Sequence, residues 1–311
     1  MHSLLLLGLA LGADPTAEDV ELKTPTGTLF ATLDLPAGKG PWPVVLIHAG
    51  SGPTDRDGNQ FLLKTDGLKM LGKGLAEKGI ACLRIDKRVA GKSLKAMGKE
   101  EDLRVTTFSD DINGWVKQLR EDRRFTKVGF IGHSEGSFLG SLATESKFDA
   151  FVSLCGLGRP FGVTVREQLK KNLPKELYEK SDAIFTDFEA GKTVADPPKE
   201  LAALFRPSVQ PYLISLCKHD PAKELAKWEC PILVVSGTTD IQVNEPDYKP
   251  LAACRKGVVG VRIENLCHTL KEAKSTEKKD QDGPYSDPKL PLHPKLVPEI
   301  AGFLTKAFEG K

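Results

Sequence analysis

The sequence predicts an α/β fold with a mostly parallel central sheet, and two observations support that prediction. First, several short runs are apolar throughout, as strands buried on both faces of a parallel sheet are. Second, amphipathic helical segments at 66–78 and 107–120 alternate with those runs, and such alternation favours right-handed strand–helix–strand units. The runs that we expect to form strands in the first half are residues 43–48, 80–86, 128–131 and 149–156.

The N-terminal part of the sheet is expected to begin with a hairpin. Polar and apolar residues alternate over 20–35, with a turn around Pro25-Thr26-Gly27, which predicts an antiparallel pair at one edge. The strand 43–48 then leads into a glycine-rich loop, 49–59. Backbone N–H groups of such a loop are able to face a ligand, and an ordinary turn is the alternative.

Residues 157–228 interrupt the alternation. They are charged, helix-leaning and rich in proline, and they contain no convincing buried strand. We therefore expect a helical lid, 157–229, inserted into an α/β core that consists of residues 14–156 and 230–311. A lid over the active site would shape the acyl or leaving-group pocket and exclude water.

The sheet is expected to resume after the lid, with helices on both of its faces. Two further apolar runs, 231–237 and 258–264, predict strands. Residues 269–293 are polar, and we expect a long surface loop there. An amphipathic helix over 296–308 closes the chain.

Composition excludes nucleic acid as an electrostatic partner. The 311 residues carry 44 Lys+Arg against 42 Asp+Glu, a formal net charge of only +2, and show no long block of one sign. Apolar residues make up 40% and charged residues 28% of the chain, which is ordinary for a globular protein.

Residues 1–13 have the pattern of a short secretory signal peptide. An apolar run over 4–11 is followed by small residues, and cleavage is expected just after Ala13. This predicts a periplasmic or secreted protein. The segment carries His2 but no Lys or Arg, so an apolar stub on a cytoplasmic protein is the alternative. The run is too short to span a bilayer.

The six cysteines show neither a C-x-x-C pair nor the spacing of a zinc site, and we predict no metal and no cofactor. Cys82 and Cys155 fall inside expected strands, as inert core thiols do. In an exported protein, Cys217–Cys230 or Cys254–Cys267 are candidate disulfides. The sequence does not decide the pairing.

Residues 128–146 contain the strongest functional motif. The strand 128–131 ends in the turn Gly132-His133-Ser134-Glu135-Gly136, and small and apolar residues then continue as a helix. A G-x-S-x-G pattern between a strand and a helix is typical of a nucleophile elbow. The turn lifts the serine hydroxyl to the carboxyl edge of the sheet, so we predict that Ser134 is a nucleophile.

A serine needs an imidazole to take its proton and a carboxylate to orient that imidazole. Asp240 follows the expected strand 231–237, and His268 follows the expected strand 258–264. Loops after parallel strands meet at one sheet edge. Taken alone, Asp240 is also compatible with a solvated turn and His268 with the surface. Together with Ser134, in the order serine–acid–histidine, they predict a catalytic triad.

An oxyanion hole requires two hydrogen-bond donors. We predict that these are the backbone N–H groups of Glu135 and of Ser51, in the glycine-rich loop. The Glu135 side chain is not expected to transfer protons. His48 ends a central strand beside this loop, where packing is the favoured role and substrate shaping the alternative.

Five motifs give the chain a family resemblance. They are AGSGPTDRDGN (49–59), IDKRVAGKS (85–93), GHSEG (132–136), GTTDIQV (237–243) and NLCH (265–268). With them, most of the chain outside the lid resembles the α/β-hydrolase superfamily, and within it bacterial esterases and serine-aminopeptidase-like hydrolases. The resemblance implies a metal-independent ester hydrolase that works through an acyl-enzyme.

The resemblance also carries the triad roles to Ser134, Asp240 and His268, and it implies a fold-building role for the triplet 86–88. Two departures affect loops beside the site. Family members commonly have glycine at one of positions 89–90, where this chain has valine and alanine. They commonly have asparagine before the histidine, where this chain has Cys267.

The expected function is hydrolysis of small to medium acyl esters by a serine hydrolase. A peptidase or amidase with the same machinery is the alternative among enzymes, and a non-catalytic binding protein is the alternative outside them. The expected partner is a small-molecule ester, or a peptide or amide, and no stable membrane span is expected. The oligomeric state is open.

Overall fold

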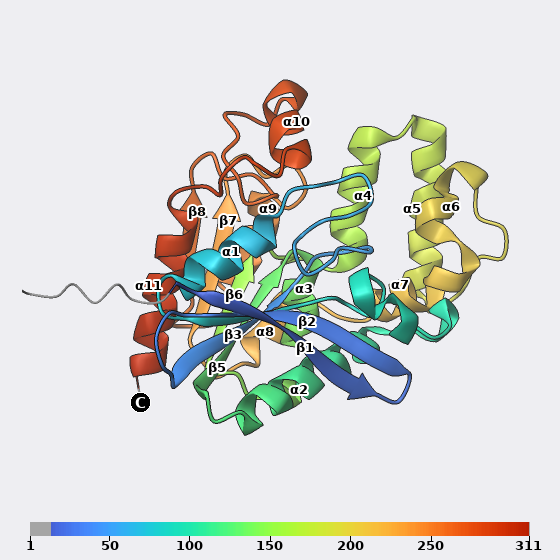
Figure 1. Ribbon diagram of the computed structural model, residues 1–311. Helices are drawn as coiled ribbons and strands as arrows, with labels where there is room; N and C mark the ends of the chain where they lie inside the picture. Colours follow the sequence, from blue (N-terminus) through green and yellow to red (C-terminus); the bar gives the residue numbers. More distant parts are fainter. Residues whose placement is uncertain (1–13, 311) are drawn as a thin grey trace, which may run out of the picture.

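An eight-stranded sheet forms the centre of the computed structural model, which describes residues 14–310 (Figure 1). The strand order is β1-β2-β4-β3-β5-β6-β7-β8. All neighbours from β4 onwards are parallel, so the predicted α/β class is confirmed. The strands are β1 (Thr16–Thr24), β2 (Gly27–Leu35), β3 (Trp42–His48), β4 (Ala81–Ile85), β5 (Phe125–His133), β6 (Ala150–Leu154), β7 (Ile232–Gly237) and β8 (Val259–Ile263).

The predicted edge hairpin is present. β1 and β2 pair antiparallel from Thr24 opposite Gly27 to Thr16 opposite Leu35, and β2 pairs antiparallel with β4 on its other side. The hairpin begins earlier than expected. The first residues of β1 are exposed. Their sequence therefore lacks the alternation of polar and apolar residues by which a strand is predicted.

Side chains of each central strand alternate between two cores, because successive residues of a strand point to opposite faces. On β3, Val45 and Ile47 pack in a cluster with helices α1 (Gly67–Ala76) and α11 (Leu296–Glu309). Val44 and Leu46 pack in the other cluster with helices α2 (Val105–Glu121) and α3 (Glu135–Ser141). The sheet is therefore covered on both faces, as a parallel sheet requires.

The segment between β6 and β7 is helical, and Figure 1 shows its helices α4 to α7 on the opposite side of the molecule from α11. Its aromatic rings pack together, with Phe185 and Phe205 centroids 5.3 Å apart and Phe188 and Phe205 centroids 5.9 Å apart. Its role as a lid stays a prediction. The helices are α4 (Phe161–Asn172), α5 (Lys175–Glu189), α6 (Ala202–Phe205), α7 (Gln210–Cys217) and α8 (Pro221–Ala226).

The expectation of a long surface loop over 269–293 is wrong, because this segment contains helix α10 (Lys278–Ser286). The helix has almost no apolar face, so its sequence carries no helical periodicity. It is held instead by the buried Gln281, whose Nε2 donates to the carbonyls of Thr239, at 3.0 Å, and Ser275, at 2.7 Å. A further helix, α9 (Glu245–Ala252), follows β7 and was not predicted.

All six cysteines are free thiols, and neither candidate disulfide is formed. Cys155 lies just after β6 rather than within it, with φ 48°. Among residues 14–310, no helix is both long and apolar enough to cross a membrane. The predicted signal peptide, 1–13, lies outside the described residues.

Buried ion pairs fasten the loop after β4 to its surroundings. The Asp86 carboxylate accepts hydrogen bonds from the backbone N–H and the guanidinium of Arg56, both at 2.8 Å, and from the backbone N–H of Lys92 at 2.9 Å. Arg88 Nε donates to Asp111 on α2 at 2.7 Å. These contacts agree with the fold-building role that the resemblance implies for this triplet.

We expect Asp86→Ala to lower the free energy of unfolding by about 3 kcal/mol or more, because it leaves the Arg56 guanidinium buried without its main partner. Asp19 contacts the same guanidinium at 3.3 Å but is 61% exposed, so Asp19→Ala should cost less than about 1 kcal/mol. Urea denaturation of both variants measures the difference. Equal losses would show that Asp86 is not the anchor of this loop.

Candidate active site

Ser134 lies in the sharp turn between β5 and α3, with φ 54° and ψ −125°. A side chain other than hydrogen does not fit at either flanking glycine. A Cβ on Gly132 would lie 2.3 Å from the Cα of Ser137, and one on Gly136 would lie 2.5 Å from the carbonyl oxygen of His48. The turn therefore has the strained strand–turn–helix geometry of a nucleophile elbow.

Asp240 and His268 follow β7 and β8 and are joined by a hydrogen bond of 2.8 Å between Asp240 Oδ2 and His268 Nδ1. Asp240 Oδ1 accepts from the backbone N–H groups of Gln242, at 2.8 Å, and Val243, at 2.9 Å. Both side chains are buried. The carboxylate therefore fixes the ring through Nδ1 and leaves Nε2 available to act on a substrate.

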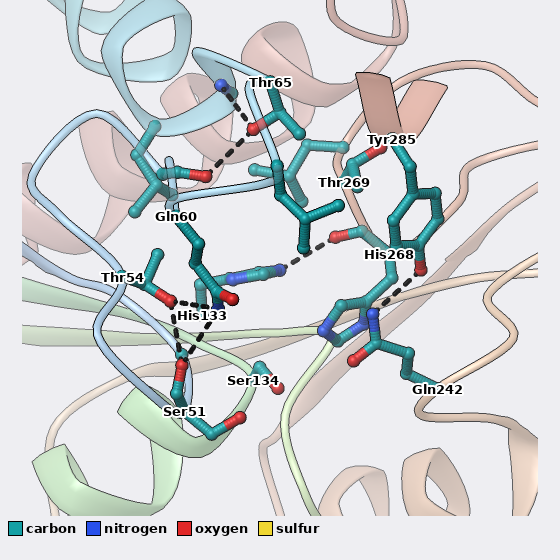
Figure 2. A pocket seen from close by; sticks show the side chains of 16 residues that line it. Ser51, Thr54, Gln60, Thr65, His133, Ser134, Gln242, His268, Thr269 and Tyr285 are labelled. Carbon is teal, nitrogen blue, oxygen red and sulfur yellow. Dashed lines mark hydrogen bonds between the residues drawn. The ribbon is translucent and has the colours of Figure 1, made fainter. Parts of the chain in front are cut away.

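Ser134 and His268 line one pocket, with the serine hydroxyl near the imidazole (Figure 2). Ser134 is 8% and His268 is 5% exposed. Within residues 14–310, the Ser134 hydroxyl makes no hydrogen bond to His268. Such bonds are commonly long without substrate and tighten in the complex, so the arrangement is compatible with general-base catalysis.

His133 supports the backbone of His268. Its Nε2 lies 2.9 Å from the carbonyl oxygen of His268, and the two rings are 4.7 Å apart. Since a carbonyl only accepts, Nε2 carries the proton and donates. Burial lowers the pKa of His133 to about 3, so the ring is neutral at ordinary pH and acts as a structural donor.

His48 has the packing role that the sequence favoured. Its side chain is buried, its Nδ1 lies 2.8 Å from the carbonyl oxygen of Ala49, and it does not line the pocket. Burial lowers the pKa of His48 to about 3. The ring at this strand end is therefore neutral at ordinary pH.

The two predicted oxyanion donors lie on segments that touch each other. A Cβ on Gly50 would lie 2.9 Å from the Cβ of Ser134, so the loop after β3 passes directly against Ser134. Among the described residues, neither the Ser51 N–H nor the Glu135 N–H has a hydrogen-bond partner. The Glu135 carboxylate is buried and accepts from the Tyr212 hydroxyl of α7.

The architecture is shared with solved structures. Est1E from Butyrivibrio proteoclasticus, with ferulic acid bound, matches 94% of this chain and all of its own with a TM-score of 0.63 and 18% identity. The α/β-hydrolase GrgF from Penicillium sp. sh18 matches 95% of this chain and all of its own with a TM-score of 0.60 and 17% identity. The chain has the α/β-hydrolase fold.

A sequence relative points in the same direction. Esterase EstD of Thermotoga maritima is 28% identical over 280 residues, which cover 88% of this chain and 65% of EstD. The chain thus spans just under two thirds of the length of that relative. No protein-family model matches the chain.

None of the residues that line the pocket belongs to the helical insertion 157–229, and the role of that insertion as a lid stays a prediction. The space beside Ser134 is occupied instead by the loop before α1 and by the segment that contains α10. The insertion contacts one lining residue through Gln168 of α4, whose Nε2 donates to the carbonyl of Gln242 at 2.8 Å. The lining residues are Gly50, Ser51, Thr54, Gly58, Gln60, Leu63, Thr65, Gly67, Leu68, His133, Ser134, Gln242, His268, Thr269, Leu270 and Tyr285.

Several polar lining residues were missed by the sequence reasoning. Gln242 Nε2 donates to the Tyr285 hydroxyl at 2.9 Å, and Gln60 Nε2 donates to the Thr54 hydroxyl at 2.7 Å (Figure 2). Gln242 lies in the GTTDIQV motif, which was a usable signal. Tyr285 lies on the unpredicted α10. No Asp, Glu, Lys or Arg is among the residues that line the pocket.

One group of side chains has the composition of a metal site. Ligand atoms of Cys155, Asp240 and His268 lie within 4.8 Å of one another. The Asp240 oxygens are already used by two backbone N–H groups and the imidazole. Burial first, and the charge of Asp240 next, raise the pKa of the Cys155 thiol well above its ordinary value. A protonated thiol is a poor metal ligand, so these donors do not suit a metal ion.

We expect Ser134→Gly to be about 1 kcal/mol more stable than Ser134→Ala, because glycine relieves the strained backbone while alanine keeps it. At Ser109, inside α2, the same two substitutions should differ by about 1 kcal/mol in the opposite sense. Thermal or urea unfolding of the four variants measures both differences. A glycine at 134 that is less stable than alanine would mean that the turn is not strained.

Proposed function

We propose that this protein is a serine hydrolase that cleaves carboxylic esters through an acyl-enzyme on Ser134. The proposal depends above all on one observation, the 2.8 Å hydrogen bond that holds the His268 imidazole to Asp240 in the pocket that Ser134 lines. The strained elbow and the similarity to esterase EstD support it. No metal or cofactor is required.

The proposed reaction begins when Ser134 Oγ attacks the carbonyl carbon of the ester and His268 Nε2 takes the hydroxyl proton. The negative charge on the carbonyl oxygen is stabilised by the N–H groups of Ser51 and Glu135. The intermediate then collapses, the C–O bond to the alcohol breaks, and His268 returns the proton to that leaving group. Water, activated by the same imidazole, attacks the acyl-enzyme and releases the acid and free Ser134.

The substrate that we propose is a small-molecule ester with a small to medium acyl group. The pocket is lined by hydroxyl, amide and leucine side chains and by no charged one, so uncharged esters are the appropriate probes.

The helical insertion 157–229 is proposed to cover the entrance side as a lid, joined to the site through Tyr212 and Gln168.

Exposure to a fluorophosphonate probe should add one adduct to the wild type and none to Ser134→Ala, because only an activated serine attacks the phosphorus. Asp240→Asn should reduce kcat for an ester by about 10⁴-fold, since the imidazole loses its orienting carboxylate. Intact-protein mass and ester turnover measure the two effects. Ser137→Ala is the matched control, because Ser137 Oγ is buried against Ser153 and should leave the adduct intact.

The absence of an adduct in folded wild-type protein would contradict this proposal. The same holds for a probe that reacts equally with Ser134→Ala. In either case a binding protein with the hydrolase fold, which retains ligand affinity in Ser134→Ala, becomes the better description.

We expect esters to be cleaved much faster than amides of the same acyl group, because amide resonance lowers the reactivity of the carbonyl and the amine leaves less readily. The kcat/KM values for a matched acetyl ester and acetyl amide measure the preference. Comparable values for both substrates would identify the enzyme as an amidase or peptidase with the same triad.

A further inference from the structure

Lys87 lies against the glycine-rich loop 49–59, and the topology of the sheet explains why. β3 and β4 are adjacent and parallel, so the loops that follow them emerge side by side at the carboxyl edge of the sheet. Lys87 follows β4, and its side chain is only 3% exposed. Its Nζ donates to the carbonyl oxygen of Gly50 and, at 2.7 Å, to that of Gly52.

These two contacts determine which way the peptide between Gly50 and Ser51 faces. In a planar trans peptide the C=O and the following N–H point in opposite directions. The Gly50 carbonyl points to Lys87, so the Ser51 N–H points away from it. Gly50 itself lies against Ser134, where a Cβ would approach within 2.9 Å, and the Ser51 N–H has no hydrogen-bond partner among the described residues.

We propose that Lys87 is a positioning residue of the oxyanion hole, which holds the Gly50 and Gly52 carbonyls so that the Ser51 N–H faces the substrate carbonyl oxygen. The inference rests on the ester hydrolysis proposed above. Lys87 does not touch the substrate, since it is absent from the pocket lining. It acts through the backbone of the loop.

Few charged groups face this ammonium. The Glu135 carboxylate raises the pKa of Lys87, but burial opposes it more strongly and lowers that pKa from 10.5 to about 8. Burial lowers the pKa of His48 and of His133 to about 3, and the positive charge of Lys87 lowers both pKa values as well. Both imidazoles are therefore neutral. The lowered pKa of Lys87 places the loss of its charge near pH 8.

Glu135 connects this cluster to the second proposed donor. Its backbone N–H is that donor, while its carboxylate lies near Lys87 and accepts from Tyr212 on α7. The ammonium thus interacts with both segments that supply the proposed donors, by hydrogen bonds with the loop that carries Ser51 and by charge with Glu135. Loss of the Lys87 ammonium would remove the hydrogen bonds that hold the loop carrying Ser51. The Glu135 N–H, which belongs to α3, would stay in place.

Activity and stability respond to the deprotonation of Lys87 with opposite signs. The proton is lost near pH 8 in the folded protein and near pH 10.5 in the unfolded chain. Between these values the unfolded state binds more protons, so this group makes the folded state more stable as pH rises. A neutral amine holds the two carbonyls less firmly, so kcat should fall through pH 8 without a loss of stability from Lys87.

The test compares ester hydrolysis by the wild type, Lys87→Met, Lys87→Arg and Lys92→Met from pH 6 to pH 9.5. We expect Lys87→Met to lower kcat by about 10- to 100-fold with little change in KM, as loss of a donor that acts in the transition state does. Lys87→Arg keeps a cation, so it should retain more activity and lose the decline near pH 8. Lys92 lies on the same loop, and its side chain is 61% exposed and pairs with Asp19. Lys92→Met should therefore match the wild type.

Three results would overturn the proposal. The first is an unchanged kcat in folded Lys87→Met. The second is a decline near pH 8 that persists in Lys87→Arg. The third is a wild-type kcat that stays constant through pH 8. This result decides the question even if Lys87→Met does not fold. Ser134→Ala is assayed alongside, because an active Ser134→Ala would contradict the proposed function itself and not the role of Lys87.

Discussion

The structure depends on the contact of two backbone turns, the elbow at Ser134 and the loop after β3. At both turns glycine leaves no room for a side chain, since a Cβ on Gly136 would meet the carbonyl of His48 at 2.5 Å and one on Gly50 would meet Ser134 at 2.9 Å. Backbone N–H groups reach a nucleophile only where the main chain comes this close. The buried Lys87 donates to the carbonyl oxygens of Gly50 and Gly52 in the loop after β3.

Most of the fold was predictable because its signal is local. The buried parallel strands are apolar throughout, and the helices of the core have an apolar face, so periodicity located them. Helix α10 escaped prediction because Gln281 holds it by hydrogen bonds to backbone carbonyls, a contact between distant segments that leaves no periodic pattern. Tyr285 was missed with it.

The candidate site was predictable to the same extent. Strand order and the elbow motif were enough to suggest Ser134, Asp240 and His268, because loops after parallel strands converge. The side chains that support the site were not. Nothing in the sequence tells that Lys87 points at two glycine carbonyls, that His133 donates to the backbone of His268, or that the insertion leaves the pocket lining to other loops. Each depends on how side chains pack in three dimensions.

The assembly of the site from distant segments has a consequence for biosynthesis. Ser51, Ser134, Asp240 and His268 meet only when β3, β5, β7 and β8 have joined one sheet, and β8 is both the last strand in the chain and an edge of the sheet. Contacts between segments so far apart in sequence form late, because closing long loops costs entropy before any contact is gained. Under the proposed mechanism, a nascent or partly folded chain therefore lacks the assembled triad and does not hydrolyse esters. Onset of ester turnover during refolding would thus report the docking of the final strand.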